Sequence, residues 1–167
     1  MIKIIHRLEW FVGLALFQVL ILNQMHINGY ATPFLFIYFI LKYNSAVGKN
    51  ELMLWAFALG LMVDMFSNTP GMNAAAATLL AFLRTPILQL VTLRDRSEAY
   101  RPGIRALGLS AYFRYVLLCS TLFCVSLLAV DAFSFFNFPI LLLKMISSIF
   151  ATIICIFCAE LIERDNK

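Results

Sequence analysis

The distribution of lysine and arginine between the apolar stretches constrains this chain more than any other feature of its sequence. Six apolar stretches divide the 167 residues, and the connections at 23–30, 67–73 and 131–138 contain no Lys or Arg. Most basic residues lie in the terminal segments and the other connections: Lys3, Arg7, Lys42, Lys49, Arg94, Arg96, Arg101, Arg105, Arg164 and Lys167. Basic residues in short connections stay on the cytoplasmic side of a membrane. The pattern therefore predicts six crossings, with both termini in the cytoplasm.

The composition also indicates a membrane protein. Apolar residues make up 62% of the chain and charged residues 13%, whereas soluble domains are about half apolar and a quarter charged. A crossing takes about 20 residues, so we expect an all-α protein with helices at about 8–25, 30–42, 52–67, 72–93, 112–130 and 136–162. Residues 1–167 then form a single transmembrane domain, which leaves no room for a soluble catalytic domain.

Enzyme, cofactor and nucleic-acid functions are not favoured by the residues present. The two histidines, His6 and His26, are far apart, and Ser147 and Ser148 have no histidine at the same level. Catalysis or metal binding needs such groups clustered. The net charge of +4 is explained by basic loops that contact anionic membrane lipids. We expect no enzyme activity, no cofactor and no nucleic-acid partner.

Small residues at four-residue spacing predict a tightly packed hairpin between the third and fourth stretches. One face of the third carries Ala56, Gly60 and Asp64, and the facing positions of the fourth are Asn73, Ala77, Ala81 and Thr85. Small residues let helix backbones approach closely in lipid. Counting from the turn places Asp64 opposite Asn73 or Ala74, and Gly60 near Ala77 or Thr78.

Asp64, Arg84 and Lys144 are charged residues that lie inside apolar stretches. At 1.5 Å per residue, Asp64 lies about 8 Å and Lys144 about 12 Å from the outer ends of their helices, so the two can pair. We favour a structural ion pair between the hairpin and the last helix over a proton or solute site. Arg84 lies about 18 Å in from the outer end, from where its guanidinium can reach the cytoplasmic headgroups.

Two segments resemble one known family. The pattern Gly60-x-x-x-Asp64, followed by Pro70-Gly71 and Asn73, resembles the signature hairpin of the rod shape-determining protein MreD family, and residues 23–38 resemble another of its segments. The turn is shorter here than in many members. The resemblance implies a non-catalytic scaffold in the bacterial inner (cytoplasmic) membrane, within the elongation complex for rod shape and peptidoglycan synthesis. It implies MreC as a partner, with MreB, RodA and the class B penicillin-binding transpeptidase of RodA. The implied fold is similar to the substrate-binding subunit of energy-coupling-factor (ECF) transporters.

Two sets of residues are candidates for function. Candidates for helix packing, partner contact or a pocket are Gly60, Asp64, Asn68, Pro70, Gly71, Asn73 and Lys144. Candidates for cytoplasmic docking are Arg94, Arg96, Arg101 and Arg105, which could also serve only topology and lipid contact. The alternative function is a solute-binding subunit of an ECF-type transporter. We prefer the scaffold, because a pocket for a hydrophilic solute needs more converging polar groups than the outer halves supply.

Overall fold

Seven α-helices and one short π-helix make up the part of the chain that the computed structural model describes, namely residues 2–22, 32–45, 47–69, 71–92, 100–131 and 138–165. No strand occurs within these ranges. In chain order the elements are α1 (Ile2–Phe17), the π-helix η1 (Gln18–Leu22), α2 (Ile37–Lys42), α3 (Lys49–Ser67), α4 (Met72–Val91), α5 (Ile104–Leu107), α6 (Leu109–Asp131) and α7 (Phe138–Asp165).

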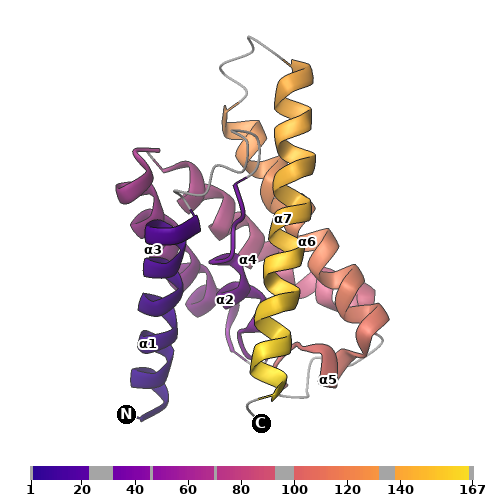
Figure 1. Cartoon of the computed structure of the whole chain (residues 1–167). Helices are drawn as coiled ribbons and strands as arrows, with labels where there is room; N and C mark the ends of the chain where they lie inside the picture. Colours follow the sequence, from indigo (N-terminus) through magenta and orange to yellow (C-terminus); the bar gives the residue numbers. More distant parts are fainter. Residues whose placement is uncertain are drawn as a thin grey trace.

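The long helices surround the short helix α2, which lies at the centre of the molecule (Figure 1). α1 packs on α3, α3 on α4, α4 on α6 and α6 on α7, while α2 contacts α1, α4 and α6. Every residue from Ile37 to Leu41 of α2 is buried. The start of α1, the short helix α5 and the end of α7 lie at one end of the molecule, which we call the α5 end.

Four helices are long and apolar enough to cross a membrane. Their apolar windows are Lys49–Ser67, Met72–Val91, Leu109–Leu127 and Leu143–Glu163, and they correspond to the third to sixth predicted crossings. The first predicted crossing is α1 continued by η1, with a shorter apolar helical stretch at Trp10–Leu20. All-helical architecture with four membrane-length helices is therefore established.

The second predicted crossing is not a continuous helix. Residues 32–34 have no regular secondary structure, and helix α2 begins only at Ile37. Prediction of a helix over 30–42 was therefore wrong for the described residues before Ile37. A non-helical backbone needs partners for its N–H groups inside an apolar bundle, and neighbouring helices supply them here.

Side chains of η1 and α7 provide those partners. Gln18 Oε1 accepts hydrogen bonds from the N–H groups of Leu35 (2.8 Å) and Phe36 (3.3 Å), and Gln18 Nε2 donates to the carbonyl of Pro33 (2.9 Å). From α7, Ser148 Oγ accepts from Thr32 N and Thr152 Oγ1 from Phe34 N, at 3.1 and 3.0 Å. The second stretch is thus interrupted because three polar side chains of other segments bind its backbone.

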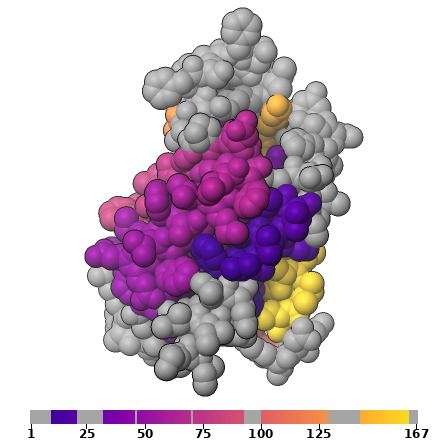
Figure 2. All heavy atoms as spheres, turned by 90° about the vertical axis from the view of Figure 1, so that its left-hand side faces the viewer, coloured from indigo at the N-terminus to yellow at the C-terminus, as the bar shows by residue number. Residues whose placement is uncertain are grey.

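The outer surface of the hairpin helix α3 is apolar. Figure 2 shows the side of the molecule on which α1 and α3 lie next to each other. The large apolar side chains that α3 exposes are Leu54, Phe57, Leu61, Met65 and Phe66. An apolar surface of this kind is typical of contact with lipid or with another protein.

Candidate functional site

Helices α3 and α4 touch through their backbones at Gly60. A β-carbon on Gly60 would lie 2.5 Å from Ala74 Cα and 2.7 Å from both Ala74 N and Asn73 O. Such distances leave no room for any side chain, so glycine is required for this approach. The close packing predicted from small residues is confirmed, although Gly60 faces Asn73 and Ala74 instead of Ala77 or Thr78.

The carboxylate of Asp64, in α3, caps the N-terminus of the neighbouring helix α4. Asp64 is 5% exposed. Its Oδ1 accepts hydrogen bonds from Asn73 N (3.0 Å), Asn73 Nδ2 (2.9 Å) and Thr69 Oγ1 (2.7 Å), and its Oδ2 accepts from Ala74 N (2.9 Å). The residue before α4 is Gly71, which has no side chain to cap the helix. Asp64 therefore supplies the acceptor and the negative charge that a helix N-terminus favours.

The predicted ion pair between Asp64 and Lys144 is wrong. Lys144 is an exposed residue of α7, and no ion pair joins these two described side chains. The physical reason is that the first N–H groups of α4 already provide the positive partner that Asp64 needs. A lysine is not required to place this carboxylate inside the bundle.

The remaining hairpin candidates shape the turn. Asn68 ends α3 in the left-handed conformation with φ of 55°, and Gly71 precedes α4 with φ of 77°. Both are exposed, whereas Asn73 is buried and also donates from Nδ2 to Thr69 Oγ1 at 3.2 Å. Gly60, Asp64 and Asn73 are thus brought together, with Asn68 and Gly71 in the adjoining turn. Pro70 lies outside the described residues.

Arg84 of α4 has partners inside the bundle, which the expected contact with headgroups did not include. Its side chain is buried, at 3% exposure. Nε donates to the hydroxyl of Tyr115 at 3.0 Å, and Nη2 donates to the carbonyls of Leu41 (3.2 Å) and Tyr43. These carbonyls end α2, and a guanidinium there satisfies acceptors that a helix C-terminus leaves free.

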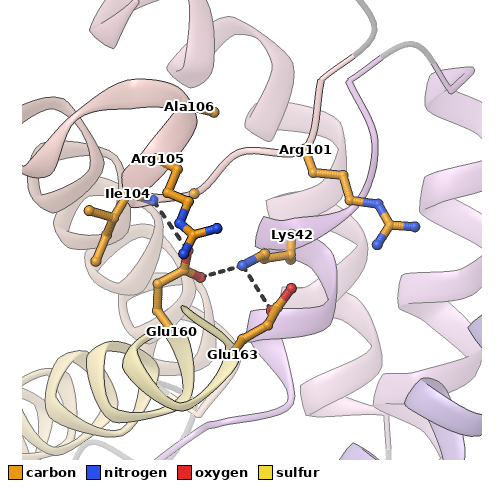
Figure 3. Close-up of a pocket in the computed structure, with 8 residues that line it drawn as sticks. Lys42, Arg101, Ile104, Arg105, Ala106, Glu160 and Glu163 are labelled. Carbon is orange, nitrogen blue, oxygen red and sulfur yellow. Dashed lines mark hydrogen bonds and ion pairs between the residues drawn. The ribbon is translucent and has the colours of Figure 1, made fainter. Parts of the chain in front are cut away.

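A cluster of ionised side chains at the α5 end was missed by the sequence analysis. Lys42 Nζ lies 2.6 Å from Glu160 Oε2 and 2.8 Å from Glu163 Oε2, and Figure 3 shows it between the two carboxylates. Tyr38 and Tyr112 place their hydroxyls 2.8 and 3.4 Å from the same oxygen of Glu160. The pairing joins α2 to α7 over more than 110 residues of sequence.

The connection between α4 and α6, which carries Arg101 and Arg105 and which we call the basic loop, closes over this cluster with its described residues. The N–H of Ile104 donates to Glu160 Oε1 at 3.2 Å, and a β-carbon on Gly103 would lie 2.7 Å from the same oxygen. Arg101 and Arg105 are exposed and line a pocket together with Lys42 and the two glutamates. Arg94 and Arg96, the other docking candidates, lie outside the described residues.

One sequence signal could have indicated the cluster. Glu160 and Glu163 are three residues apart near the end of an apolar stretch, which puts both carboxylates on one face of a helix. Their partner Lys42 was interpreted only as a residue that sets orientation. No spacing in the sequence connects positions 42 and 160, since the fold alone brings them together.

The four cysteines lie in α6 and α7. No group of three or more His, Cys, Asp or Glu side chains that could hold a metal ion occurs within the described ranges. Cys119 and Cys124 are buried free thiols of α6, and Cys155 and Cys158 are free thiols of α7. Buried thiols of this kind act as small apolar groups.

In the comparisons with known proteins, no family model, no curated protein and no solved structure matches the chain.

Proposed function

We propose that this protein is a non-catalytic scaffold of the bacterial cell-elongation complex in the inner membrane, where it associates with an MreC-like protein. The proposal includes six crossings with both termini in the cytoplasm, which places the α5 end on the cytoplasmic side. MreB, RodA and the transpeptidase of RodA are proposed as further members of the assembly. The resemblance of the hairpin sequence to the MreD family is the starting point.

The geometry of Asp64 carries the preference for a scaffold over a solute-binding subunit. All four hydrogen bonds to its carboxylate come from the hairpin itself. A carboxylate so occupied has little remaining capacity to accept bonds from a solute. The segment that resembles the family signature therefore holds α3 and α4 together. Such a role fits a protein that presents a fixed surface to partners.

The interrupted second stretch also fits a structural role. Discontinuous helices line solute sites in many transporters, but here the non-helical backbone before α2 is bound by Gln18, Ser148 and Thr152. The aromatic rings of Phe34 and Phe36 pack against Phe123, with centroids 5.2 and 5.4 Å apart. Protein side chains thus fill the space around the non-helical residues before α2.

Affinity purification from bacterial membranes in a mild detergent tests the proposal. We expect an MreC-like protein to copurify with the wild-type chain and with Ala58→Leu, which alters an exposed position of α3. Gly60→Leu should reduce capture per molecule of protein in the membrane, because it forces α3 and α4 apart. Copurification with ABC ATPases in place of an MreC-like protein would support the transporter and contradict the scaffold.

A further inference from the structure

The hydroxyl group of Tyr38 has more acceptors around it than its single hydrogen atom can serve. Its oxygen lies 2.8 Å from Glu160 Oε2 and 2.9 Å from Glu163 Oε2. A tyrosine hydroxyl donates one hydrogen bond, and an ionised carboxylate can only accept. When both glutamates are ionised, one of these two contacts therefore has no hydrogen atom between its oxygens.

Lys42 cannot supply the missing hydrogen atom. Its Nζ donates to the Tyr38 hydroxyl at 3.2 Å, which uses a lone pair of the tyrosine oxygen and leaves the contacts between oxygen atoms as they are. Distances of 2.8 and 2.9 Å are typical of O–H···O hydrogen bonds, whereas two acceptor oxygens without a hydrogen between them repel. A proton on one of the carboxyl groups removes this conflict.

Glu163 is the better position for that proton. Glu160 already accepts hydrogen bonds on its two carboxylate oxygens, from Ile104 N, Lys42, Tyr38 and Tyr112. These four donors use the acceptor positions of a carboxylate, which number about four, so a proton on Glu160 would displace one of them. A proton on Glu163 Oε2 points instead at the remaining lone pair of the Tyr38 oxygen.

We propose that the cluster around Lys42 is a proton-binding site, in which Glu163 carries a proton that it donates to the Tyr38 hydroxyl. Tyr38 then donates to Glu160, and each of its contacts has a hydrogen atom. One lysine and two glutamates carry a formal charge of −1, which the proton brings to zero. The proton thereby strengthens the attachment of α7 to α2. This inference does not depend on the partner proteins proposed above.

The cations near Glu163 oppose the binding of a proton. Among the described side chains they are Lys42, at 2.8 Å, and Arg101 and Arg105, which line the same pocket of about 140 Å³. Cations favour the ionised form of a neighbouring carboxyl group, whereas a hydrogen bond donated by the carboxyl group favours its protonated form. From α6, Tyr112 contributes an uncharged hydroxyl group. We therefore expect Glu163 to release its proton as the pH rises, and its side chain is 18% exposed, so water can reach it.

A bound proton makes the stability of the protein depend on pH. A glutamate of the unfolded chain loses its proton at about pH 4.3, so above this pH the folded state binds one proton more than the unfolded state. Stability then falls as the pH rises, until Glu163 is ionised in the folded state as well. Two carboxylates that are both ionised in the folded state would instead give no such fall above about pH 5.

The full chain, purified in a non-ionic detergent, is suited to the test. Its thermal unfolding is followed by the fluorescence of Trp10 and Trp55 at several values between about pH 5 and pH 8. Glu163→Gln cannot titrate, but its amide can donate to the Tyr38 oxygen in the same way as a protonated carboxyl group. We expect the unfolding temperature of the wild type to fall over this range by about 5 °C relative to that of Glu163→Gln.

Glu51→Gln is the matched control. Glu51 is an exposed glutamate of α3, and its carboxylate accepts a hydrogen bond from the Tyr43 hydroxyl at 2.7 Å. The substitution removes the same carboxyl group beside a tyrosine elsewhere in the chain, so it should keep the pH dependence of the wild type.

Tyr38→Phe separates the hydroxyl group from simple repulsion between the carboxylates. It removes the oxygen that requires the proton but keeps Glu160 and Glu163. We expect its pH dependence to be as small as that of Glu163→Gln, whatever its stability at a single pH. If Tyr38→Phe keeps the dependence of the wild type, the proton does not belong to the hydrogen bond with Tyr38 and the proposal is overturned.

Infrared difference spectra between about pH 5 and pH 8 give a readout that does not depend on stability. The C=O stretching band of a protonated carboxylic acid should decrease in the wild type as the pH rises, and this change should be absent in Glu163→Gln. Absence of such a band from the wild type at the lower pH would overturn the proposal. Parallel unfolding profiles of the wild type and Glu163→Gln would also overturn it.

Discussion

The carboxylate of Asp64 in α3 accepts both the backbone N–H and the side-chain N–H of Asn73 in α4. A side chain of α3 thus caps the N-terminus of α4. With Gly71 preceding α4, the first turn has no local acceptor side chain, and the cap comes from a residue seven positions earlier in the chain. The stability of α4 therefore depends on the position of α3.

Replacement of Asp64 should destabilise the hairpin without any contribution from Lys144. Asp64→Ala leaves the N–H groups of Asn73 and Ala74 without their acceptor, and each such buried group costs about 1 to 3 kcal/mol. Asp64→Asn should be milder, because it retains one oxygen. Thermal unfolding in detergent measures both changes.

Lys144→Met is the control for this prediction. It alters an exposed residue, so it should change stability little on its own and should not rescue Asp64→Ala. A double variant that is clearly more stable than Asp64→Ala alone would mean that the two charges interact after all.

Even the smallest side chain at position 60 should push the two hairpin helices apart. Overpacking of a tight contact typically costs about 1 to 3 kcal/mol, so Gly60→Ala should lower stability and Gly60→Leu should lower it further. Ala58→Leu adds more volume on the exposed side of α3 and should be tolerated. Equal unfolding temperatures for Gly60→Ala and the wild type would rule out the backbone contact with Ala74.

Gln18→Leu should weaken the interrupted second stretch. The change removes three hydrogen bonds to Pro33, Leu35 and Phe36 while keeping a side chain of similar size. Buried backbone groups without partners cost about 1 to 3 kcal/mol each. Unfolding in detergent should occur at a lower temperature than in Gln89→Leu, which changes an exposed glutamine of α4; a similar effect of both substitutions would contradict the argument.

Lys42→Met should be more harmful than Glu163→Gln. Without Lys42, two carboxylates face each other in a largely buried site, and removal of one partner of a buried pair typically costs about 3 to 5 kcal/mol. Glu163→Gln leaves Lys42 paired with Glu160 at 2.6 Å. We expect the combination Lys42→Met with Glu160→Gln to recover part of the loss, as measured by a double-mutant cycle. Strict additivity would contradict a coupled cluster.

The hairpin could be predicted from sequence because its determinants are local. Small residues at four-residue spacing and the turn near Thr69 gave bounds for α3 and α4 within three residues of those observed, and they placed Asp64 on the inward face. The facing residues Asn73 and Ala74 were also predicted, but the role of their backbone N–H groups as partners of Asp64 was missed for a physical reason. Backbone N–H groups at a helix start carry partial positive charge, yet they do not appear as charged residues when a sequence is read for ion pairs.

Structural features that depend on contacts between residues far apart in the chain could not be predicted in this way. The break before α2 depends on Gln18, Ser148 and Thr152, and the second apolar stretch alone has the composition of a helix. Arg84 has acceptors at the end of α2 that exist only because that helix stops inside the bundle. The cluster around Lys42 likewise requires α7 to be in place.

The hydrogen bonds between α7 and residues 32–34 have a consequence for biosynthesis. The N–H groups of Thr32 and Phe34 find their acceptors 116 and 118 residues later in the chain. With the six crossings proposed above, the second stretch enters the bilayer during translation with part of its backbone unsatisfied, a state that lipid cannot relieve. Insertion of the last helix, α7, supplies the missing acceptors. A ribosome that stalls before α7 therefore leaves a nascent chain whose second stretch lacks them.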